Sequence, residues 1–589
     1  MDTQRFAFPA AAGPSEDACS TIVVGRKASS TGRILIGHSE DNGGLIFNPQ
    51  HYVPPARHRE GEKIRYEPGT AEIPLPRETL GFYWSQTLSP AGESFGDCFV
   101  NDAGVVIVSN ACVGIYDAGQ SVTEGGIGYG LRRSMAERAH SAREAVNIAA
   151  ELLSRYGYIS EGRTYTVADP EEAWQIAVLQ GRGWAARRVG EREVIYLPNC
   201  FMMQRLKPDG ETTLVSPGLY ERLRKAGHFL ASDDGSFDFR TAVQSSARRT
   251  DARNSIRNCL AWKRLAGIRV EDPDEAPYCA VPERTVSPED VRDALRLHEG
   301  DFGQAEAGWL HYSGYGVCRP TTHESMVLEL RRPAFLISGA RTYSRPCETP
   351  YVPFFPLAGP AAALEEKSGS AALAAQFAGN PEDFDWREAR GSAPFVKAAN
   401  AADFLRGESY ERLAAAVRSL EEGWKGEREA LAEKFAASPK AEALPALHAF
   451  NEEKLAQAQA AVGRLFPELM PCRFEILAER IDPESDEPFE AALYEAPGVN
   501  LEALRLAHTR IGAGREAVGN LETLEGHSAP ALRMEIRTIG GRRAAVFAFS
   551  QKAAAAGLLK GSCRDLWLYT DENGRRITAC AAVLVGRKA

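Results

Sequence analysis

The first apolar runs of the chain predict a β-hairpin that starts at Cys19. Residues 20–25 and 33–37 are the two apolar runs, and Ser30-Thr31-Gly32 between them is typical of a turn. The second run continues into the acidic pair Glu40-Asp41. Because a tight hairpin brings its two ends together, we expect the carboxylate of Asp41 to lie close to the Cys19 thiol.

Strands and helices then follow in an order that differs from the regular alternation of a parallel βαβ protein. Residues 99–110 predict a hairpin that turns on Asp102-Ala103-Gly104. Residues 131–156 have helical spacing, with Ser141 and Glu144 as a capping box and Gly157 as the stop. Further strands are expected over 163–167, 173–179, 184–189 and 194–197, a helix over 251–265, and a β-rich part over 316–355 whose clearest strand is 325–330. We therefore expect an α+β core of stacked antiparallel sheets flanked by helices.

The composition changes after Pro360, where Ala and charged residues become frequent. Helices over 409–436 and 443–465 are expected to pack on the core as a hairpin. Residues 470–589 predict a last α+β segment with strands near 532–538, 543–549, 566–570 and 576–586. Residues 1–18 show no periodicity and no apolar run long enough for a signal peptide. The expected organisation is thus a dispensable segment over 1–18, a core over 19–360, a helical extension over 361–469 and a C-terminal segment over 470–589.

Length, charge and cysteine content exclude several classes of function. The chain has 589 residues, more than one ordinary domain, and a net charge of -10 with no polybasic block, so neither nucleic acid nor an anionic membrane is expected as a partner. No apolar stretch is long enough to span a membrane. The 11 Cys residues are widely spread without a Cys-x-x-Cys motif, which argues against a zinc ribbon or a disulfide framework and favours a reducing, cytoplasmic location. No phosphate-binding loop and no spacing typical of a metal site is present.

A thiol beside a carboxylate suggests nucleophilic catalysis by Cys19. A free thiol with a pKa of about 8.5 is only slightly ionised at neutral pH and needs a base. None of the 11 His residues lies in a recognisable cysteine-protease signature. The α-amino group of Cys19 would titrate near pH 8 (pKa about 7.7–8.0), but only if the bond between Ala18 and Cys19 is cut. The local pattern alone also fits an ordinary half-buried Cys in a strand that follows a frayed terminus.

Several motifs, taken in their order along the chain, resemble a known family. The matching segments are Cys19-Ser20-Thr21, Ser39-Glu40-Asp41, 142–157, 168–174, 184–189, Leu197-Pro198-Asn199, 318–325 from Cys318, and 344–353 with Ser344-Arg345-Pro346-Cys347. Together they resemble the dipeptidase A family of N-terminal-nucleophile cysteine hydrolases, which is related to choloylglycine hydrolase and penicillin V acylase. The resemblance extends over about residues 19–465, and residues 470–589 carry none.

The resemblance implies both a fold and a reaction. The fold is a four-layer αββα sandwich, here with a C-terminal helical and α+β extension. The proenzyme of this family cuts itself before the Cys, so residues 1–18 would be an autocleaved propeptide. The Cys thiol then attacks an amide carbonyl and forms a thioester that water hydrolyses. The chain is therefore predicted to be a cysteine dipeptidase of broad specificity that acts on small peptides and needs neither a metal nor an organic cofactor.

The resemblance also assigns roles to residues besides Cys19. Asp41 would hydrogen-bond the amine or the thiol of Cys19. Asn199 would help to hold the tetrahedral oxyanion, and Asn110 would supply a second donor, with Ser109 as a competing candidate. Arg257 would support the site electrostatically. Without the resemblance, Asp41 and Asn199 are typical of turns and Arg257 of a helix surface.

One position departs from the family, and three functions stay open. Related acylases carry an Arg where this chain has His38, and a His can be neutral at pH 7, so a permanent positive charge beside the thiol is not assured. His38 could instead act as a base or donor, or only fill a structural position. An acyl-amide hydrolase with the same nucleophile and a non-catalytic binding protein of the secernin type are the alternatives to the dipeptidase. The sequence leaves self-association into a homo-oligomer open.

Overall fold

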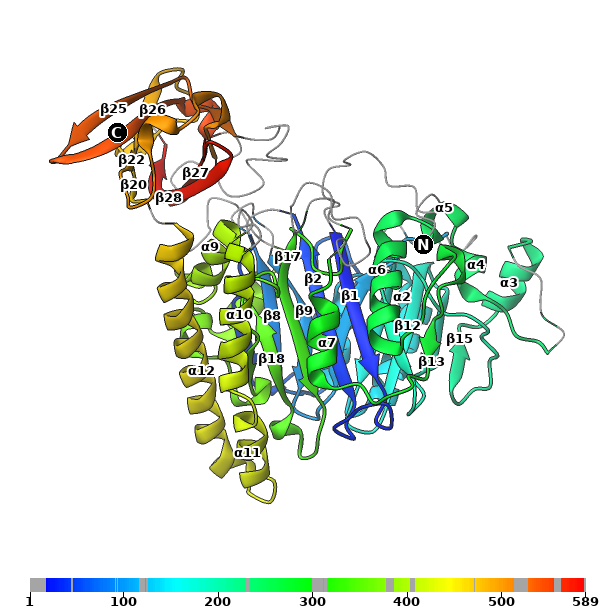
Figure 1. Ribbon diagram of the computed structural model, residues 1–589. Helices are drawn as coiled ribbons and strands as arrows, with labels where there is room; N and C mark the ends of the chain where they lie inside the picture. Colours follow the sequence, from blue (N-terminus) through cyan, green and yellow to red (C-terminus); the bar gives the residue numbers. More distant parts are fainter. Residues whose placement is uncertain are drawn as a thin grey trace.

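Two large antiparallel β-sheets form the first part of the chain in the computed structural model (Figure 1). The structure describes residues 17–43, 46–89, 92, 94–115, 122, 125–228, 232, 234–298, 311, 315–377, 386–402, 408–470, 472–512, 528–555 and 563–586. The expected residues 1–16 of the N-terminal segment lie outside these ranges. The class is mixed α and β with large antiparallel sheets, as the sequence predicted.

The first sheet contains the hairpin that starts at Cys19. Its seven strands run in the order β16 (Cys279–Ala280), β14 (Val194–Leu197), β1 (Asp17–Val24), β2 (Leu35–Asn42), β17 (Thr322–Glu329), β18 (Ser338–Thr342) and β19 (Val352–Phe354). The predicted hairpin is confirmed, and its turn uses Gly32 at φ +68°, a conformation that favours glycine. A β-carbon at Gly37 would lie 2.4 Å from Val291 Cγ1, so this glycine lets helix α7 (Pro288–Leu295) approach the sheet closely.

The second sheet has eight strands and carries the second predicted hairpin. The order is β15 (Thr213–Val215), β13 (Trp184–Arg188), β12 (Ala173–Gly181), β11 (Tyr158–Ala168), β10 (Val106–Ala111), β9 (Ser94–Asn101), β8 (Phe82–Leu88) and β3 (Gln50–Val53). The turn between β9 and β10 falls at Asp102-Ala103-Gly104, as predicted, with Gly104 at φ +92°. Strand β1 of the first sheet contacts β10 of the second, so the two sheets face each other at the centre of each.

Helices cover the outer side of each sheet. Helices α1 (Gly130–Arg138) and α2 (Ala142–Tyr156) pack on the eight-stranded sheet, and α6 (Ala252–Ala266) and α7 pack on the seven-stranded one. The helical region expected over 131–156 is two helices, because Ser141 caps α2 by accepting a hydrogen bond from the Glu144 amide at 3.1 Å. Within the described part of the chain, no helix has the length and the apolar character needed to cross a membrane.

A group of helices lies beyond the β19 edge of the first sheet. It comprises α9 (Ala393–Ala402), α10 (Glu408–Gly423), α11 (Glu427–Lys434) and α12 (Lys440–Leu469), and α12 contacts both α9 and β19. The single helix expected over 409–436 is wrong. The chain breaks between α10 and α11, where Gly426 adopts φ +83° and so leaves the helical conformation.

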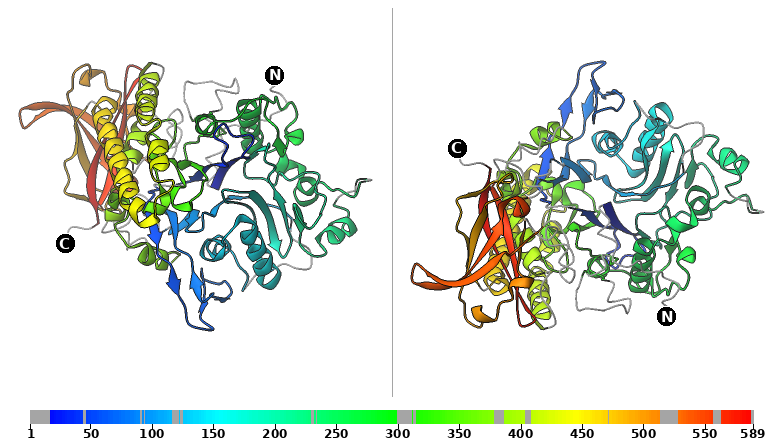
Figure 2. Two further views of the ribbon diagram at one scale, coloured as in Figure 1. Left: turned by 90° about the horizontal axis from the view of Figure 1, so that it is seen from below. Right: turned by 90° about the horizontal axis from the view of Figure 1, so that it is seen from above.

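The last part of the chain forms two smaller sheets. One has the order β20 (Phe474–Ile476), β22 (Pro488–Tyr494), β26 (Arg542–Ser550), β25 (Arg533–Ile539), and the other β21 (Arg480–Ile481), β28 (Arg575–Val585), β27 (Cys563–Glu572), β23 (Arg510–Gly512), β24 (Ala529–Pro530). The four strands predicted here are confirmed. A separate apolar core fills this part. Figure 1 shows these strands beyond the end of α12, and Figure 2 shows them on the same side of the large sheets as the yellow helices.

The remaining short elements lie in the connections. They are β4 (Ala56–Arg57), β5 (Lys63–Ile64), β6 (Ile73–Pro74), β7 (Glu78–Thr79), α3 (Leu219–Lys225), α4 (Phe239–Val243), α5 (Ser246–Arg249), α8 (Gly369–Ala374) and α13 (Gln551–Ala554), with 3-10 turns such as η2 (Pro273–Glu275).

Candidate active site

The register of the first hairpin decides which carboxylate faces the Cys19 thiol. Cys19 pairs with Glu40, and Ala18 pairs with Asp41. Side chains of consecutive strand residues point to opposite faces of a sheet. Cys19 and Glu40 therefore share the face that looks toward the second sheet, and Asp41 belongs to the other face. The expectation that Asp41 lies beside the thiol is corrected on this point: the neighbouring carboxylate is Glu40, which the sequence analysis did not single out as a site residue.

The Cys19 thiol is buried, and its surroundings keep it protonated. Burial raises the pKa of the thiol well above its ordinary value, and the carboxylates of Glu40 and Asp97 raise it further, while Arg163 opposes them. Burial, followed by the negative charge of Asp97, also raises the pKa of Glu40 to about 7. Glu40 is within hydrogen-bond reach of the thiol. A neutral thiol thus faces a carboxyl group that can accept its proton near neutral pH.

His38 is held between two oxygen partners in a way that fixes its protonation. Its Nε2 lies 2.5 Å from Asp97 Oδ2, a carboxylate that can only accept, and its Nδ1 lies 2.8 Å from Thr21 Oγ1. The Thr21 hydroxyl donates its only proton to Asn110 Oδ1 at 2.5 Å. Nδ1 must therefore donate to Thr21, and both ring nitrogens carry a proton.

The electrostatics agree with a charged imidazolium. Burial disfavours the charge, but Asp97 and then Glu40 outweigh it and raise the pKa of His38 to about 9. His38 is thus positively charged at neutral pH, beside the Cys19–Glu40 pair. The structure therefore provides a cation at residue 38, where the sequence alone did not assure a positive charge.

Asp97 on β9 is the centre of this charge network and was missed in the sequence. It accepts hydrogen bonds from Arg132 on α1, from Ser109 Oγ at 3.0 Å and from His38. Its side chain is fully buried. Burial disfavours the carboxylate, but Arg132 and His38 overcome it and hold the pKa of Asp97 well below its usual range. An acidic residue directly before the apolar run Cys98-Phe99-Val100 was the available signal.

Asn199 and Arg257 hold the backbone of Cys19 on both sides. Asn199, just after β14, accepts the Cys19 backbone amide at 2.8 Å through Oδ1, and the same oxygen accepts from Arg257 Nη2 at 2.9 Å. Arg257 Nη1 donates to the Cys19 carbonyl oxygen at 2.8 Å. Arg257 is only 1% exposed, so it is not a helix-surface residue. Asn199 Nδ2, the predicted oxyanion donor, donates to Ala111 O at 3.1 Å in this form of the chain.

Asn110 and Asp41 bind residues other than Cys19. Asn110 connects the sheets, since it accepts from Thr21 and its Nδ2 donates to Leu197 O at 3.0 Å. Asp41 accepts a hydrogen bond from Thr322, and its Oδ2 lies 3.6 Å from Arg319 Nη1. Burial raises the pKa of Asp41, and Arg319 opposes this shift. The catalytic roles of these two residues stay predictions.

The structure therefore brings five of the six sequence-predicted residues into one connected group. Asn199 and Arg257 contact the Cys19 backbone directly, His38 reaches Cys19 through Glu40, and Asn110 reaches it through Thr21 and His38. Asp41 stands on the opposite face, across from Ala18. In this group Asn199 and Arg257 can hold the Cys19 backbone fixed, and Glu40 can exchange a proton with the Cys19 thiol.

Two groups among the described residues could hold a metal ion. One is His38 with Glu40 and Asp97, and the other is His298 with His311, Cys318 and Cys347. The first group is a charge network rather than a ligand set, because both nitrogens of His38 carry protons and offer no lone pair. The second group was missed in the sequence because the four residues are too widely spaced for a recognisable motif.

A family model matches the first half of the chain, and curated relatives align with about half of its length. Residues 18–303 match the model of peptidase family C69. A probable dipeptidase B of Lactococcus lactis subsp. lactis (strain IL1403) is 26% identical over 290 residues, 48% of this chain and 60% of that protein. A probable dipeptidase A of Streptococcus pyogenes serotype M1 is 25% identical over 293 residues, 48% of this chain and 62% of that protein. The matched part of the chain thus spans about three fifths of the length of these curated relatives.

One solved structure shows a weak likeness to part of this chain. A mutant conjugated bile acid hydrolase from Clostridium perfringens is 10% identical, with 55% of this chain and 89% of that chain covered at a TM-score of 0.26.

Proposed function

We propose that this chain, whose resemblance to the dipeptidase A family is confirmed over residues 18–303, is a cysteine dipeptidase of broad specificity that matures by cutting the bond before Cys19. One observation carries the proposal: Asn199 Oδ1 binds the Cys19 nitrogen at 2.8 Å while Arg257 binds the Cys19 carbonyl oxygen at 2.8 Å. Cleavage before Cys19 would release an α-amine that already lies on a fixed acceptor beside the thiol.

Glu40 is proposed to start maturation. The Cys19 sulfur attacks the carbonyl carbon of Ala18 while Glu40 accepts the thiol proton. The tetrahedral intermediate then collapses, the bond from that carbon to the Cys19 nitrogen breaks, and the nitrogen takes a proton to become the free amine. Residues 1–18 remain as a thioester on sulfur until water hydrolyses it to an acid and the thiol. The raised pKa of Glu40, about 7, allows this carboxyl to accept and return a proton near neutral pH.

The new amine then serves as the base for peptide hydrolysis. It takes the Cys19 thiol proton as sulfur attacks the dipeptide carbonyl, and it returns that proton to the leaving amine of the second amino acid. Water hydrolyses the resulting thioester. Asn199 and Asn110 are proposed as oxyanion donors, which requires their amide groups to leave the carbonyls of Ala111 and Leu197. One such donor is typically worth about 10²–10³ in rate.

The domain organisation belongs to the same proposal. Residues 19–360 would form the αββα core, supported by two facing sheets with helices on each outer side. Residues 361–469 would be an extension packed on that core, and 470–589 a C-terminal unit, supported by its separate apolar core. Small peptides in the cytoplasm would be the substrates.

The N-terminus of the purified protein tests this function. We expect intact mass and N-terminal sequencing to give a chain that starts at Cys19, and this protein to hydrolyse unmodified dipeptides faster than N-acyl amino acids. Faster hydrolysis of N-acyl amino acids would favour the acyl-amide hydrolase instead. A chain that keeps residues 1–18 and hydrolyses neither substrate would favour the binding protein of the secernin type. Dipeptide hydrolysis by the uncut chain would exclude the α-amine mechanism.

Two adjacent carboxylates give a matched pair of variants for the proton steps. Glu40→Gln removes the acceptor opposite the thiol, so we expect cleavage before Cys19 to slow by about 10²-fold or more. Asp41→Asn alters the other face, beside Ala18, and we expect impaired maturation, turnover or both. A time course of intact mass and a dipeptide assay on the matured fraction separate the two effects. Mature Asp41→Asn protein with normal rates would leave Asp41 a structural residue.

A further inference from the structure

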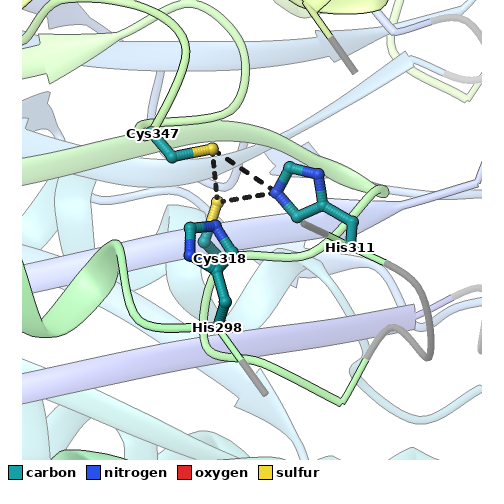
Figure 3. A group of neighbouring side chains, drawn as sticks. All are labelled: His298, His311, Cys318 and Cys347. Carbon is teal, nitrogen blue, oxygen red and sulfur yellow. Dashed lines mark hydrogen bonds between the residues drawn. The ribbon is translucent and has the colours of Figure 1, made fainter. Parts of the chain in front are cut away.

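Four metal-ligating side chains from separate segments meet beside the end of α7 (Figure 3). His298 follows α7, His311 lies in the connection to the first sheet, Cys318 precedes β17, and Cys347 follows β18. All four are buried. They play no part in the hydrolytic reaction proposed above.

The distances among these side chains fit a tetrahedral transition-metal site. His311 Nε2 lies 3.4 Å from both Cys318 Sγ and Cys347 Sγ, and the two sulfurs are 3.5 Å apart. The ligand atoms of the whole group lie within 4.8 Å of one another. A zinc ion at about 2.3 Å from sulfur and about 2.0 Å from nitrogen requires separations of about 3.8 Å between two sulfurs, about 3.5 Å between sulfur and nitrogen and about 3.3 Å between two nitrogens. To bind an ion, the ligand atoms of His311, Cys318 and Cys347 would move apart by at most about 0.3 Å, and His298 would supply the fourth ligand.

We propose that His298, His311, Cys318 and Cys347 bind one Zn²⁺ as a closed structural site. Two thiols lose their protons to solvent when the ion binds, so the dication and two thiolates give a complex without net charge. Such a complex suits a buried position. Four protein ligands leave no open position for substrate, which separates this site from a catalytic zinc.

The proposed ion would fix the turn that holds Asp41. Cys318 directly precedes Arg319, whose guanidinium lies 3.6 Å from the Asp41 carboxylate, and the Cys318 amide donates to Leu297 O at 2.9 Å. The Arg319 amide donates to the hydroxyl of Thr322 at 2.9 Å, and that hydroxyl donates to Asp41. Ligation of Cys318 would therefore tie the end of α7 to the turn that precedes β17.

The competing structure is a disulfide between Cys318 and Cys347. Both residues are free thiols here, and a disulfide needs the sulfurs at about 2.05 Å, much closer than the observed 3.5 Å. A disulfide would also leave the two His side chains without a shared function. The two alternatives differ in what the purified chain contains, so analysis of its metal content and thiols separates them.

The test measures metal in the full-length chain, independently of any hydrolytic activity. We expect about one Zn²⁺ per wild-type chain by elemental mass spectrometry. Replacement by Co²⁺ should give the intense near-ultraviolet absorption of a cobalt–thiolate bond. Cys318→Ser and Cys347→Ser should each weaken retention against a chelator by at least about 100-fold. Cys472→Ser, which changes a buried free Cys of the C-terminal part, is the matched control and should retain the ion.

Two results would overturn the site. One is a wild-type chain that carries no zinc and takes up no Co²⁺ after reduction of its thiols. The other is a linked peptide pair containing Cys318 and Cys347 in the mass map of the freshly purified protein. The Co²⁺ spectrum of the wild-type chain decides the question even where a variant fails to fold. Because no part of this test uses peptide hydrolysis, its outcome is separate from that of the proposed function.

Discussion

Cys19→Ala should abolish both the cleavage before residue 19 and the hydrolysis of dipeptides. The change removes the sulfur that would form both thioesters, and no other nucleophile in the described network occupies its position opposite Glu40. Loss of a catalytic nucleophile typically costs about 10⁴-fold or more in turnover. Intact mass reports the cleavage, and a dipeptide assay reports the turnover. Cys19→Ser should behave similarly, because an alcohol is far harder to ionise than a thiol.

Cys98→Ala is the matched control for the loss of a buried sulfur. Cys98 is buried on β9, one residue after Asp97, and its Sγ lies 3.3 Å from Met326 Sδ. This variant also leaves a small cavity in the core. It should still mature and hydrolyse dipeptides. Turnover that survives Cys19→Ala would remove Cys19 from the mechanism, whereas equal loss in both variants would point to a defect in folding.

The sequence predicted the local hairpin well but not its pairing partners. Apolar runs on either side of Ser30-Thr31-Gly32 located β1 and β2, because a turn and its two strands are encoded by neighbouring residues. The register was less accessible. A shift of one residue in the pairing of two strands moves every side chain to the other face of the sheet. The observed register differs by one residue from the one we expected, so Glu40 and not Asp41 lies opposite Cys19.

Contacts between distant segments account for the residues that the sequence missed. His38 and Asp97 are joined across two different sheets, and Cys318 meets Cys347 only because β17 and β18 pair side by side. Neither pair has a spacing that a motif could reveal. Asn199 and Arg257 were found only because the family resemblance marked them. The residues themselves, an Asn after a strand and an Arg in a helix, are ordinary in those positions.

Asp97→Asn should destabilise the eight-stranded sheet by about 3–5 kcal/mol, because it leaves Arg132 and the His38 imidazolium buried without their shared carboxylate. Native-state hydrogen exchange of the β10 amides measures this loss within one sheet. Glu171→Gln is the control. Glu171 pairs with Arg26 at the surface, where both side chains are more than a third exposed, so its loss should cost at most about 1 kcal/mol.

The pH dependence of the stability difference between wild type and Asp97→Asn shows whether His38, a partner of Asp97, is charged. The pKa of Asp97 is lowered, so its contribution is present above the ordinary carboxylate pKa of about 3.9 and is lost as the pH falls through the lowered value. The pKa of His38 is raised to about 9, so its contribution is complete below about pH 6.5 and is lost as the pH rises through about 9. The difference in the free energy of unfolding between wild type and Asp97→Asn should therefore be largest near pH 5–6 and decrease toward pH 9. The share of this difference that comes from Arg132 should remain at pH 9. A gap that stays constant from pH 6 to 9 would mean that His38 is neutral, and the positive charge beside Cys19 would then have to come from Arg163.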